Sequence, residues 1–167
     1  SAGLTVAIAG SGRQALLQLA AVSLAAPIRV AHVWSPTATH RERFAAEAQA
    51  GLGVECRALP TVREAVAGAA VVVTVTRARE PFLALADLAA DVHVNAVGSL
   101  LPGHRELADD VLDAAGLVVA DDPQSAAGQS AEVRHWLDRD PAHATRLQAL
   151  AALLVAPPAT RPRLTVF

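Results

Sequence analysis

The chain has 167 residues, of which 53% are hydrophobic, 18% are charged and 3% are aromatic, and this composition predicts one folded globular domain rather than a disordered chain. The 14 basic and 16 acidic residues give a formal net charge of -2, so the chain lacks the positive excess that would favour a nucleic acid or an anionic membrane as partner. Every basic residue is arginine, which leaves no lysine for a Schiff base.

Short apolar runs alternate with segments of helical periodicity along the chain. In chain order, the expected elements are a strand at 4–9, a helix at 13–25, a strand at 28–34, a helix at 39–50, a strand at 54–59, a helix at 62–67, strands at 70–75 and 92–97, a helix at 106–114, a strand at 117–120, a helix at 142–154 and a strand at 164–167. Residues 124–136 are polar and mixed, and no element is assigned to them. This alternation predicts an α/β fold, a Rossmann-type doubly wound and mostly parallel sheet with helices on both faces.

A glycine-rich turn joins the first expected strand to the first expected helix. Its sequence, GSGRQA at residues 10–15, has the G-x-G-x-x-A spacing of a dinucleotide-binding turn. The first glycine permits the tight turn, the second lets a pyrophosphate approach the backbone, and the small final residue lets helix and strand pack closely. A plain chain reversal is the alternative, which the flanking strand and helix disfavour. We therefore predict cofactor contacts from Gly10, Ser11, Gly12, Arg13 and Gln14.

The end of the second strand favours NADP(H) over NAD(H). Sites that prefer NAD commonly place Asp or Glu about 20 residues after the glycines, and residues 33–37 contain neither. Ser35, Thr37 and Arg41 instead offer hydroxyl groups and positive charge for a 2′-phosphate. The same residues would also suit the start of the next helix, with Thr39 as its N-cap. NADP(H) is the expected cofactor, and NAD(H) is the alternative.

Several stretches taken together resemble the ornithine cyclodeaminase/μ-crystallin family. They are AGSGRQA at 9–15, VWS at 33–35, EAVAGA at 64–69, VTVT at 73–76, HVNAVG at 93–98, PGHREL at 102–107, VADD at 119–122 and LTVF at 164–167. The NAVG and REL pieces, in this order, are much more specific than the glycine-rich turn.

The resemblance covers essentially the whole chain and implies that residues 1–167 are one NAD(P)-binding domain. Family members carry a separate substrate and dimerisation domain, whose lysine and arginines meet the substrate, and this chain has no counterpart of it. The resemblance therefore implies a longer protein that is a homodimer and acts on a small-molecule imine or amino acid. The isolated chain is expected to be inactive.

Carried onto this sequence, the resemblance adds cofactor contacts at the ends of two strands. Thr74 and Thr76 would line the dinucleotide crevice, and Asn95, Val97 and Gly98 would approach the nicotinamide. The threonines also suit a buried strand through β-propensity alone. Asn95 is harder to explain by structure alone, because an amide in an apolar run needs hydrogen-bond partners; a hydrogen bond to a neighbouring loop is the alternative. No catalytic residue is assigned.

Two departures from the family pattern bear on the chemistry. Cyclodeaminases and the alanine dehydrogenase of the family look to have an acidic residue two places after the glycine of NAVG. This chain has Leu100 at that place, and a leucine side chain cannot exchange a proton. Pro36 stands where relatives that use NADP tend to have arginine. The resemblance therefore implies the cofactor-binding domain of a ketimine or imino-acid reductase, in which NADPH supplies hydride to C=N. An ornithine cyclodeaminase using bound NAD and a non-catalytic dinucleotide-binding module are the alternatives.

The remaining polar residues have simpler interpretations. The six histidines form no pair four residues apart and no cluster with acidic residues, so no metal site is expected. Cys56 is the single cysteine, which favours a reducing, cytoplasmic location. We interpret it as a small buried apolar residue rather than as a nucleophile. His104 is expected at the surface near a helix start. Asp121 and Asp122 precede Pro123, a pattern typical of helix capping.

Overall fold

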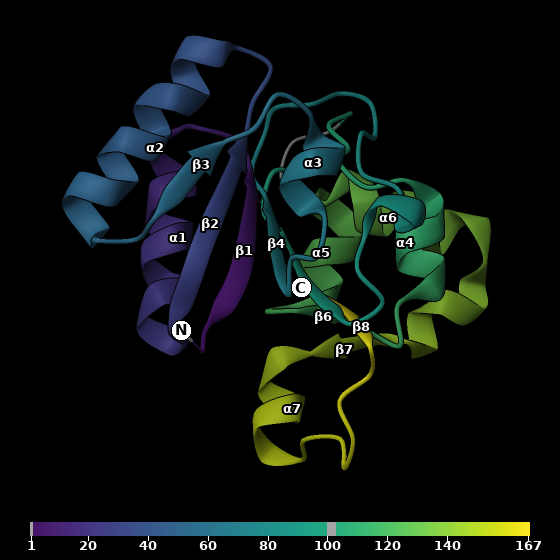
Figure 1. The fold of residues 1–167 in the computed structure, drawn as a ribbon. Helices are drawn as coiled ribbons and strands as arrows, with labels where there is room; N and C mark the ends of the chain where they lie inside the picture. The colour runs from purple at the N-terminus through teal and green to yellow at the C-terminus, as the bar shows by residue number, and fades with distance from the viewer. Residues whose placement is uncertain (1, 100–102) are drawn as a thin grey trace.

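The computed structural model describes residues 2–99 and 103–167, which form one parallel sheet with helices on both faces (Figure 1). Its strands are β1 Leu4–Ala9, β2 Ile28–Trp34, β3 Cys56–Ala58, β4 Val71–Thr74, β5 Val92–Ala96, β6 Leu117–Ala120, β7 Leu147–Ala149 and β8 Leu164–Val166. The strand order in the sheet is β3-β2-β1-β4-β5-β8-β6-β7, and every neighbouring pair is parallel. The predicted doubly wound α/β fold is confirmed.

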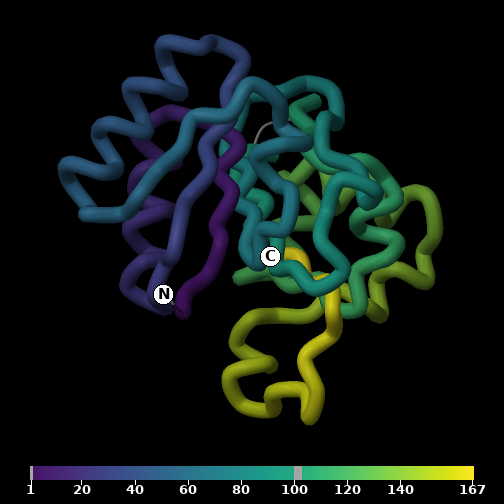
Figure 2. Tube along the Cα trace, in the orientation of Figure 1, coloured from purple at the N-terminus to yellow at the C-terminus, as the bar shows by residue number. Residues whose placement is uncertain are grey.

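The helices are α1 Arg13–Ala25, α2 Ala38–Leu52, α3 Val62–Val66, α4 Asp109–Ala114, α5 Pro123–Gln129, α6 Ala131–Arg139 and α7 Leu150–Val155, with short 3-10 helices η1 Leu85–Asp87 and η2 Pro141–Thr145. None of the described helices is both long enough and apolar enough to cross a membrane. Helix α7 has no buried residue and projects away from the sheet together with the loop that leads to β8 (Figure 2).

Two hydrophobic clusters lie on opposite faces of the sheet. On one face, Leu19 of α1 and Phe44 of α2 pack with Ile8 and Val33. The connections from β1 to β2 and from β2 to β3 both run in the same direction along the sheet, away from β1. Because both crossovers are right-handed, α1 and α2 lie on the same face of the sheet. Burial of a side chain as large as Phe44 contributes about 1.5–3 kcal/mol relative to exposure.

The second cluster forms because the chain returns to the middle of the sheet after β3. Residues from α3, α4 and α6 cover the face that α1 and α2 leave free, and Trp136 of α6 is the largest fully buried side chain there. The reversal of direction between β1 and β4 creates a switch point in the strand order. Open α/β sheets bind ligands at such a point, beyond the carboxyl ends of the strands.

The C-terminal third differs from the expectation for residues 142–154. Instead of one helix, this stretch contains part of η2, the strand β7 and the first turns of α7. Residues 147–149 pair with β6 at the edge of the sheet. Tertiary pairing has therefore overridden a helical pattern of apolar residues, which is a weak signal by itself.

Two further segments differ from expectation, apart from shifts of one or two residues at the ends of other elements. The helix predicted from residue 106 starts at Asp109, because Leu107 forms a bridge with Leu83 in the preceding loop. Residues 124–136, to which no element was assigned, lie in α5 and α6. Asp122 and Ser130 cap these two helices with their side chains, which offsets the polar composition.

Candidate dinucleotide site

The glycine-rich turn lies where β1 meets α1, at the edge formed by the carboxyl ends of the strands (Figure 1). Gly10 has a φ of 128°, and its N–H donates to the carbonyl of Trp34 over 2.8 Å. A Cβ atom at Gly10 would lie 2.5 Å from the carbonyl oxygen of Val75. The backbone conformation and this close approach each exclude a side chain, so only glycine fits.

Gly12 has different surroundings. It is the N-cap of α1 with a φ of -87°, and a Cβ atom there would meet no atom of the described residues within 4 Å. Within the described chain no side chain caps α1, and the first turn of this helix has no acidic residue. The first N–H groups of the helix are therefore free to meet an anion, which the helix dipole also favours. Ser11 is half-buried beside them, and Arg13 and Gln14 are exposed.

Ser35, Thr37 and Arg41 meet just beyond β2. The hydroxyl of the buried Ser35 donates to the carbonyl of Thr37 over 3.3 Å, and Nη1 of Arg41 donates to the carbonyl of Ser35 over 3.1 Å. The expectation that Thr39 caps the next helix is wrong: Thr37 is the N-cap, because Ser35 and Pro36 complete the turn directly after the strand. The guanidinium group is thus held at the strand end, where a 2′-phosphate is expected.

The end of β4 lies between β1 and β5. The N–H of Val97 donates to the carbonyl of Thr74 over 2.8 Å. The Thr74 side chain is fully buried in the sheet, and its hydroxyl has no hydrogen-bond partner among residues 2–99 and 103–167. Thr76 lies beyond the strand, and its N–H and hydroxyl donate to one carboxylate oxygen of Glu106 over 2.5 and 2.7 Å. Thr76 therefore lies at the carboxyl edge of the sheet, whereas the Thr74 hydroxyl lies inside the sheet.

Glu106 ties the ends of two strands together. Its side chain is completely buried, and its second oxygen accepts from the N–H of Gly98 over 2.9 Å. A Cβ atom at Gly98 would lie 2.4 Å from the carboxyl group of Glu106, so the carboxylate occupies the place of the missing side chain. One carboxylate thus holds Thr76 after β4 and Gly98 after β5.

A second buried glutamate supports the loop that carries Glu106. Glu132 of α6 is 3% exposed, and its Oε1 accepts from the N–H of Leu107 over 3.1 Å and from the N–H of Glu106. Burial raises the pKa of the Glu132 carboxyl above its ordinary value, although the two backbone N–H groups act in the opposite direction. Its Oε2 has no partner within the part of the chain that the structure describes.

Asn95 has a partner in its own strand rather than in a neighbouring loop. Its Oδ1 accepts from Nε2 of His93 over 2.9 Å, and Nδ1 of His93 lies 2.7 Å from the hydroxyl of Thr165. Burial lowers the pKa of His93, so the neutral ring that donates through Nε2 and accepts through Nδ1 is favoured. Only Oδ1 of Asn95 is used among the described residues, which leaves its NH2 group for another acceptor.

The structure brings the predicted residues to one edge of the sheet. Gly10 to Gln14 follow β1, Ser35 to Arg41 follow β2, and the residues around Thr76 and Gly98 follow β4 and β5, which are neighbours in the strand order. Leu100, whose type bears on deamination, lies outside the described residues. No group of three or more His, Cys, Asp or Glu side chains in residues 2–99 and 103–167 is arranged to hold a metal ion.

Other residues singled out in the sequence have structural roles. Asp122 caps α5 as predicted, accepting from the N–H groups of Gln124 and Ser125. Cys56 is buried, and burial raises the pKa of its thiol to about 11, so the thiol is protonated at neutral pH. His104 is half-buried rather than exposed, and its Nδ1 has no partner in the described part of the chain.

A family model described as "Ornithine cyclodeaminase/mu-crystallin family" matches residues 2–147. The chain belongs to this family. A curated member, the ketimine reductase mu-crystallin of Rattus norvegicus, is 34% identical over 126 residues, which are 75% of this chain and 39% of the rat protein. An uncharacterised cyclodeaminase of Sinorhizobium fredii is 37% identical over 114 residues, 68% of this chain and 34% of that protein.

Solved structures of the family agree with the fold. The Δ1-pyrroline-2-carboxylate reductase of Thermococcus litoralis, solved with NADH and L-proline, has a TM-score of 0.90 at 26% identity and covers 99% of this chain. A lysine cyclodeaminase has a TM-score of 0.85 at 34% identity over 99% of this chain. The chain spans 52% and 47% of these two proteins, so it corresponds to about half of each.

The structure gives a role to a residue for which the sequence predicted none. Glu106, in the REL piece of the family pattern, holds Thr76 and Gly98 through its carboxylate. The sequence carried one weak indication of this role, namely that Glu106 stands directly before an apolar residue, Leu107, which is itself buried. A carboxylate that is buried with such a neighbour needs several hydrogen-bond donors. Glu132 gave no such signal, since it lies in a polar stretch with no assigned element.

Proposed function

We propose that this chain is the NAD(P)-binding domain of a ketimine or imino-acid reductase, with NADPH as the preferred cofactor. The observation that carries the proposal is the open N-terminus of α1 beside Gly12, at the switch point of a doubly wound sheet. A site with free N–H groups, no acidic residue in the first turn and no bulky side chain fits a pyrophosphate. The names of the rat relative and of the Thermococcus structure, both reductases of C=N compounds, support the reaction class.

Three parts of the cofactor have residues that would hold them. The turn at residues 10–14 would bind the pyrophosphate, and Ser35, Thr37 and Arg41 would bind the 2′-phosphate. Asn95 and Gly98 would lie next to the nicotinamide ring, where the free NH2 group of Asn95 can donate to a carbonyl oxygen. When bound, NADPH would supply hydride to the carbon of the C=N bond. Glu106 keeps the backbone at this edge in place and excludes a side chain at Gly98.

The substrate and the assembly belong to a longer protein. Because the chain covers about half of its solved relatives, residues outside it would bind the small-molecule imine or amino acid. We expect that longer protein to be a homodimer. An alanine dehydrogenase of the same fold, 22% identical, is described as a dimer with bound NAD, which is in keeping with this expectation.

Titration calorimetry with NADPH and NADH tests the cofactor assignment. We expect NADPH to bind at least about tenfold more tightly, since a charge-assisted contact to the 2′-phosphate contributes about 1.5–3 kcal/mol. Arg41→Ala should weaken NADPH by about the same factor and leave NADH unchanged. Arg43→Ala is the matched control, because Arg43 lies on the same helix and pairs with Glu47 at the surface.

Two results would count against this proposal. Equal affinities for NADPH and NADH would overturn the preference for NADP(H) while leaving dinucleotide binding intact. Absence of binding by either cofactor at millimolar concentration would overturn the assignment of a dinucleotide domain.

A cyclodeaminase is the second candidate, favoured by the 34% identity to a lysine cyclodeaminase. Leu100 weighs against it, because a leucine cannot take up a proton from the reacting amine. An ammonia-release assay with the longer protein and a diamino acid separates the two functions. Release of ammonia without added reductant would favour the cyclodeaminase over the reductase. Inactivity in both assays with intact NADPH binding would favour a non-catalytic module.

A further inference from the structure

Three polar side chains from two neighbouring strands form a row on the sheet face opposite Trp136. His93 and Asn95 stand two residues apart in β5, so their side chains share a face, and Thr165 of β8 is the register partner of His93. The intervening Val94 belongs to the hydrophobic cluster around Trp136, which places the three polar side chains on the other face. Thr165 is 5% exposed, and His93 and Asn95 are half-buried.

Hydrogen bonds join these three side chains in a fixed direction. Nδ1 of His93 lies 2.7 Å from the hydroxyl of Thr165, and Nε2 lies 2.9 Å from Oδ1 of Asn95. An amide oxygen only accepts, so the neutral ring carries its proton on Nε2 and the hydroxyl donates to Nδ1. On the other side of β5, the register partners of His93 and Asn95 are Val71 and Val73, whose side chains cannot compete for these bonds.

This row gives the Asn95 amide one defined orientation. With Oδ1 held by His93, the NH2 group points away from the ring and keeps its two donors for another molecule. The two ends of an amide group have nearly the same shape and differ only in hydrogen bonding. Without the donor on His93, the amide can therefore turn over and exchange the positions of its oxygen and its NH2 group. The ring thus decides whether Asn95 offers a donor or an acceptor.

We propose that His93, held by Thr165, is a positioning residue that makes Asn95 present its NH2 group to the carboxamide of the nicotinamide ring. This inference rests on the proposed function, in which Asn95 lies next to that ring. The NH2 group then donates to the carbonyl oxygen of the carboxamide, so the site recognises the carbonyl group of the cofactor and not its NH2 group. Burial lowers the pKa of His93, which keeps the ring neutral and Nδ1 able to accept.

The ring tautomer of His93 is tested in the free chain. Nitrogen chemical shifts of the ring, measured by NMR at neutral pH, distinguish a proton on Nε2 from a proton on Nδ1, and we expect it on Nε2. Thr165→Val keeps the side-chain shape and removes the hydroxyl, so a fraction of the rings should move the proton to Nδ1. A parent ring protonated on Nδ1 would overturn the proposal, because Nε2 would then accept from the amide of Asn95. An unchanged ring in Thr165→Val would overturn the role of Thr165.

Titration calorimetry then compares NADP⁺ with its acetylpyridine analogue, in which a methyl group replaces the NH2 group of the carboxamide and the carbonyl group is kept. The parent chain should bind the two within about threefold of each other, since only the carbonyl group is recognised. His93→Phe keeps a ring and removes the donor, so the Asn95 oxygen can turn towards the ligand. That oxygen accepts from the carboxamide of NADP⁺ but meets no donor on the analogue. We therefore expect the variant to bind the analogue at least about fivefold more weakly than NADP⁺.

Two further variants separate positioning from a general structural effect. His93→Gln should restore similar binding of the two ligands, because its NH2 group can donate to Oδ1 of Asn95 in place of Nε2. His32→Phe is the control: His32 is a half-buried histidine of β2 whose Nδ1 lies 3.1 Å from the carbonyl oxygen of Ala65, and its loss should leave the affinity ratio unchanged.

The outcomes for the two proposals differ. A parent chain that binds both ligands, with the same affinity ratio in His93→Phe as in the parent, overturns the positioning role of His93 and leaves the cofactor assignment intact. A parent chain that binds neither ligand overturns the proposed function and the positioning role with it.

Discussion

Gly10 and Gly12 stand two residues apart in the glycine-rich turn, but the described chain excludes a side chain at only one of them. At Gly10 the folded chain itself excludes a side chain, because φ is 128° and the carbonyl of Val75 is too close. At Gly12 the described chain leaves room for a side chain, so we expect a requirement for glycine there to come only from the proposed ligand. Gly10 is therefore needed for the fold, and Gly12 is proposed for binding.

This difference predicts a large loss of stability for one alanine substitution and almost none for the other. Gly10→Ala should lower the free energy of unfolding of the free chain by about 1–3 kcal/mol, the usual cost of strain at a special backbone conformation. Gly12→Ala should change it by less than about 0.5 kcal/mol, as at an open surface position. Chemical denaturation of both variants measures these values.

Cofactor binding completes the test of the glycine pair. Saturating NADPH should raise the unfolding temperature of the parent chain, because a ligand at 100 times its Kd stabilises the folded form by about 2.7 kcal/mol. The rise should be lost in Gly12→Ala, whose methyl group would occupy the place of the pyrophosphate. A Gly12→Ala chain that is stabilised like the parent would show that no ligand approaches this position.

At the scale of elements, the sheet edge is held together by a loop rather than by a strand. Residues 103–108 lie between β5 and α4 in the chain and lead into α4, and within them Glu106 reaches across to Thr76 and Gly98. Glu132 of α6 holds that loop from behind. Helix α6 thus holds the loop through Glu132, and the loop holds the sheet edge through Glu106. In this way a polar helix on the second face contributes to the candidate site.

Removal of the Glu106 carboxylate should loosen this edge. Glu106→Ala leaves the N–H groups of Thr76 and Gly98 without their acceptor, and each unpaired group costs about 1–3 kcal/mol. Glu106→Gln retains one acceptor oxygen and should lose distinctly less. Urea unfolding ranks the two variants, and amide hydrogen exchange at Thr76 and Gly98 localises the effect. Equal exchange rates in Glu106→Ala and the parent chain would contradict the assigned role.

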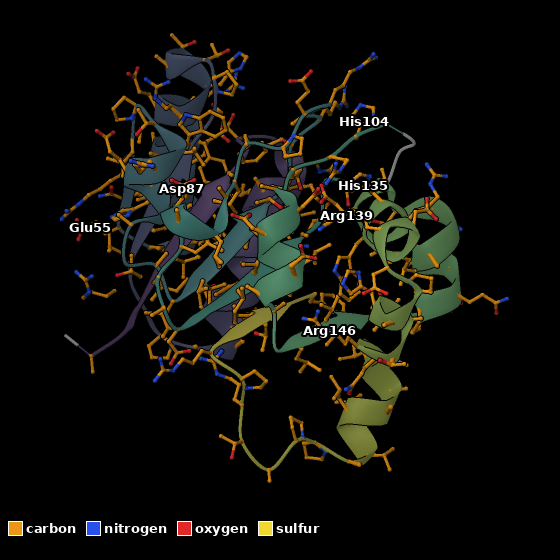
Figure 3. All side chains as sticks on the ribbon, turned by 90° about the vertical axis from the view of Figure 1, so that its right-hand side faces the viewer. Glu55, Asp87, His104, His135, Arg139 and Arg146 are labelled. Carbon is orange, nitrogen blue, oxygen red and sulfur yellow. The ribbon has the colours of Figure 1, made fainter. Side chains whose placement is uncertain are left out.

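The contact between α4 and α6 is the second feature at this scale, and it is ionic. Asp113 of α4 accepts from Arg139 of α6 over 2.7 Å, and Asp109 accepts from Arg105 over 2.5 Å (Figure 3 labels Arg139 beside His135). Hydrogen bonds from Arg105 and Arg139 lower the pKa of Asp109 and Asp113, respectively, below 3.8. Both carboxylates are partly exposed, so solvent screens much of the attraction.

These shifts predict a loss of stability at acid pH. A carboxyl whose pKa is lower in the folded chain stabilises the fold above its ordinary pKa, and this contribution disappears as the pH falls through the lowered value. The relevant window lies below about pH 3.8 for Asp109 and Asp113. The free energy of unfolding, measured between pH 7 and pH 2.5 in urea, should fall in that window, and Asp113→Asn should flatten the curve there.

The pKa of Glu132 is shifted upward, whereas those of Asp109 and Asp113 are shifted downward. The contribution of Glu132 to the pH dependence of stability can therefore be measured separately. Because burial raises its pKa above 4.5, the folded chain binds its proton more readily than the unfolded chain. Stability therefore increases as the pH falls through the raised pKa towards 4.5. Glu132→Gln should remove this increase and leave the acid loss below pH 3.8 unchanged. An identical profile for Glu132→Gln and the parent chain would contradict the pKa assigned to Glu132.

For the whole molecule, one eight-stranded sheet separates two cores, and the candidate site lies where the two halves of the sheet meet. The strands β3, β2 and β1 with α1 and α2 carry the residues proposed to hold the phosphates, and β4 onwards carries those expected near the nicotinamide. Figure 2 shows α7 and the following loop standing apart from both cores. The chain is about half as long as its solved relatives, so the active site of the longer protein is expected to include residues from outside this domain.

The sequence by itself determined the features that depend on neighbours along the chain. The strands at 4–9 and 28–34 and the helix at 13–25 were predicted to the residue, because each combines a strong periodic pattern with a glycine or proline at its end. The fold class and the family followed from the alternation of elements and from the NAVG and REL motifs. The glycine-rich turn was also a local feature, since its strand, glycines and helix are contiguous in the sequence.

Tertiary structure alone decided the features that join distant segments. Residues 147–149 form a strand only because β6 offers a free edge, which no local pattern encodes. The pairing of Glu106 with Thr76 and Gly98, and of Glu132 with the Glu106 loop, spans 8 to 30 residues in sequence. A buried charge is stable only where several donors converge on it, and that convergence is created by packing rather than by composition.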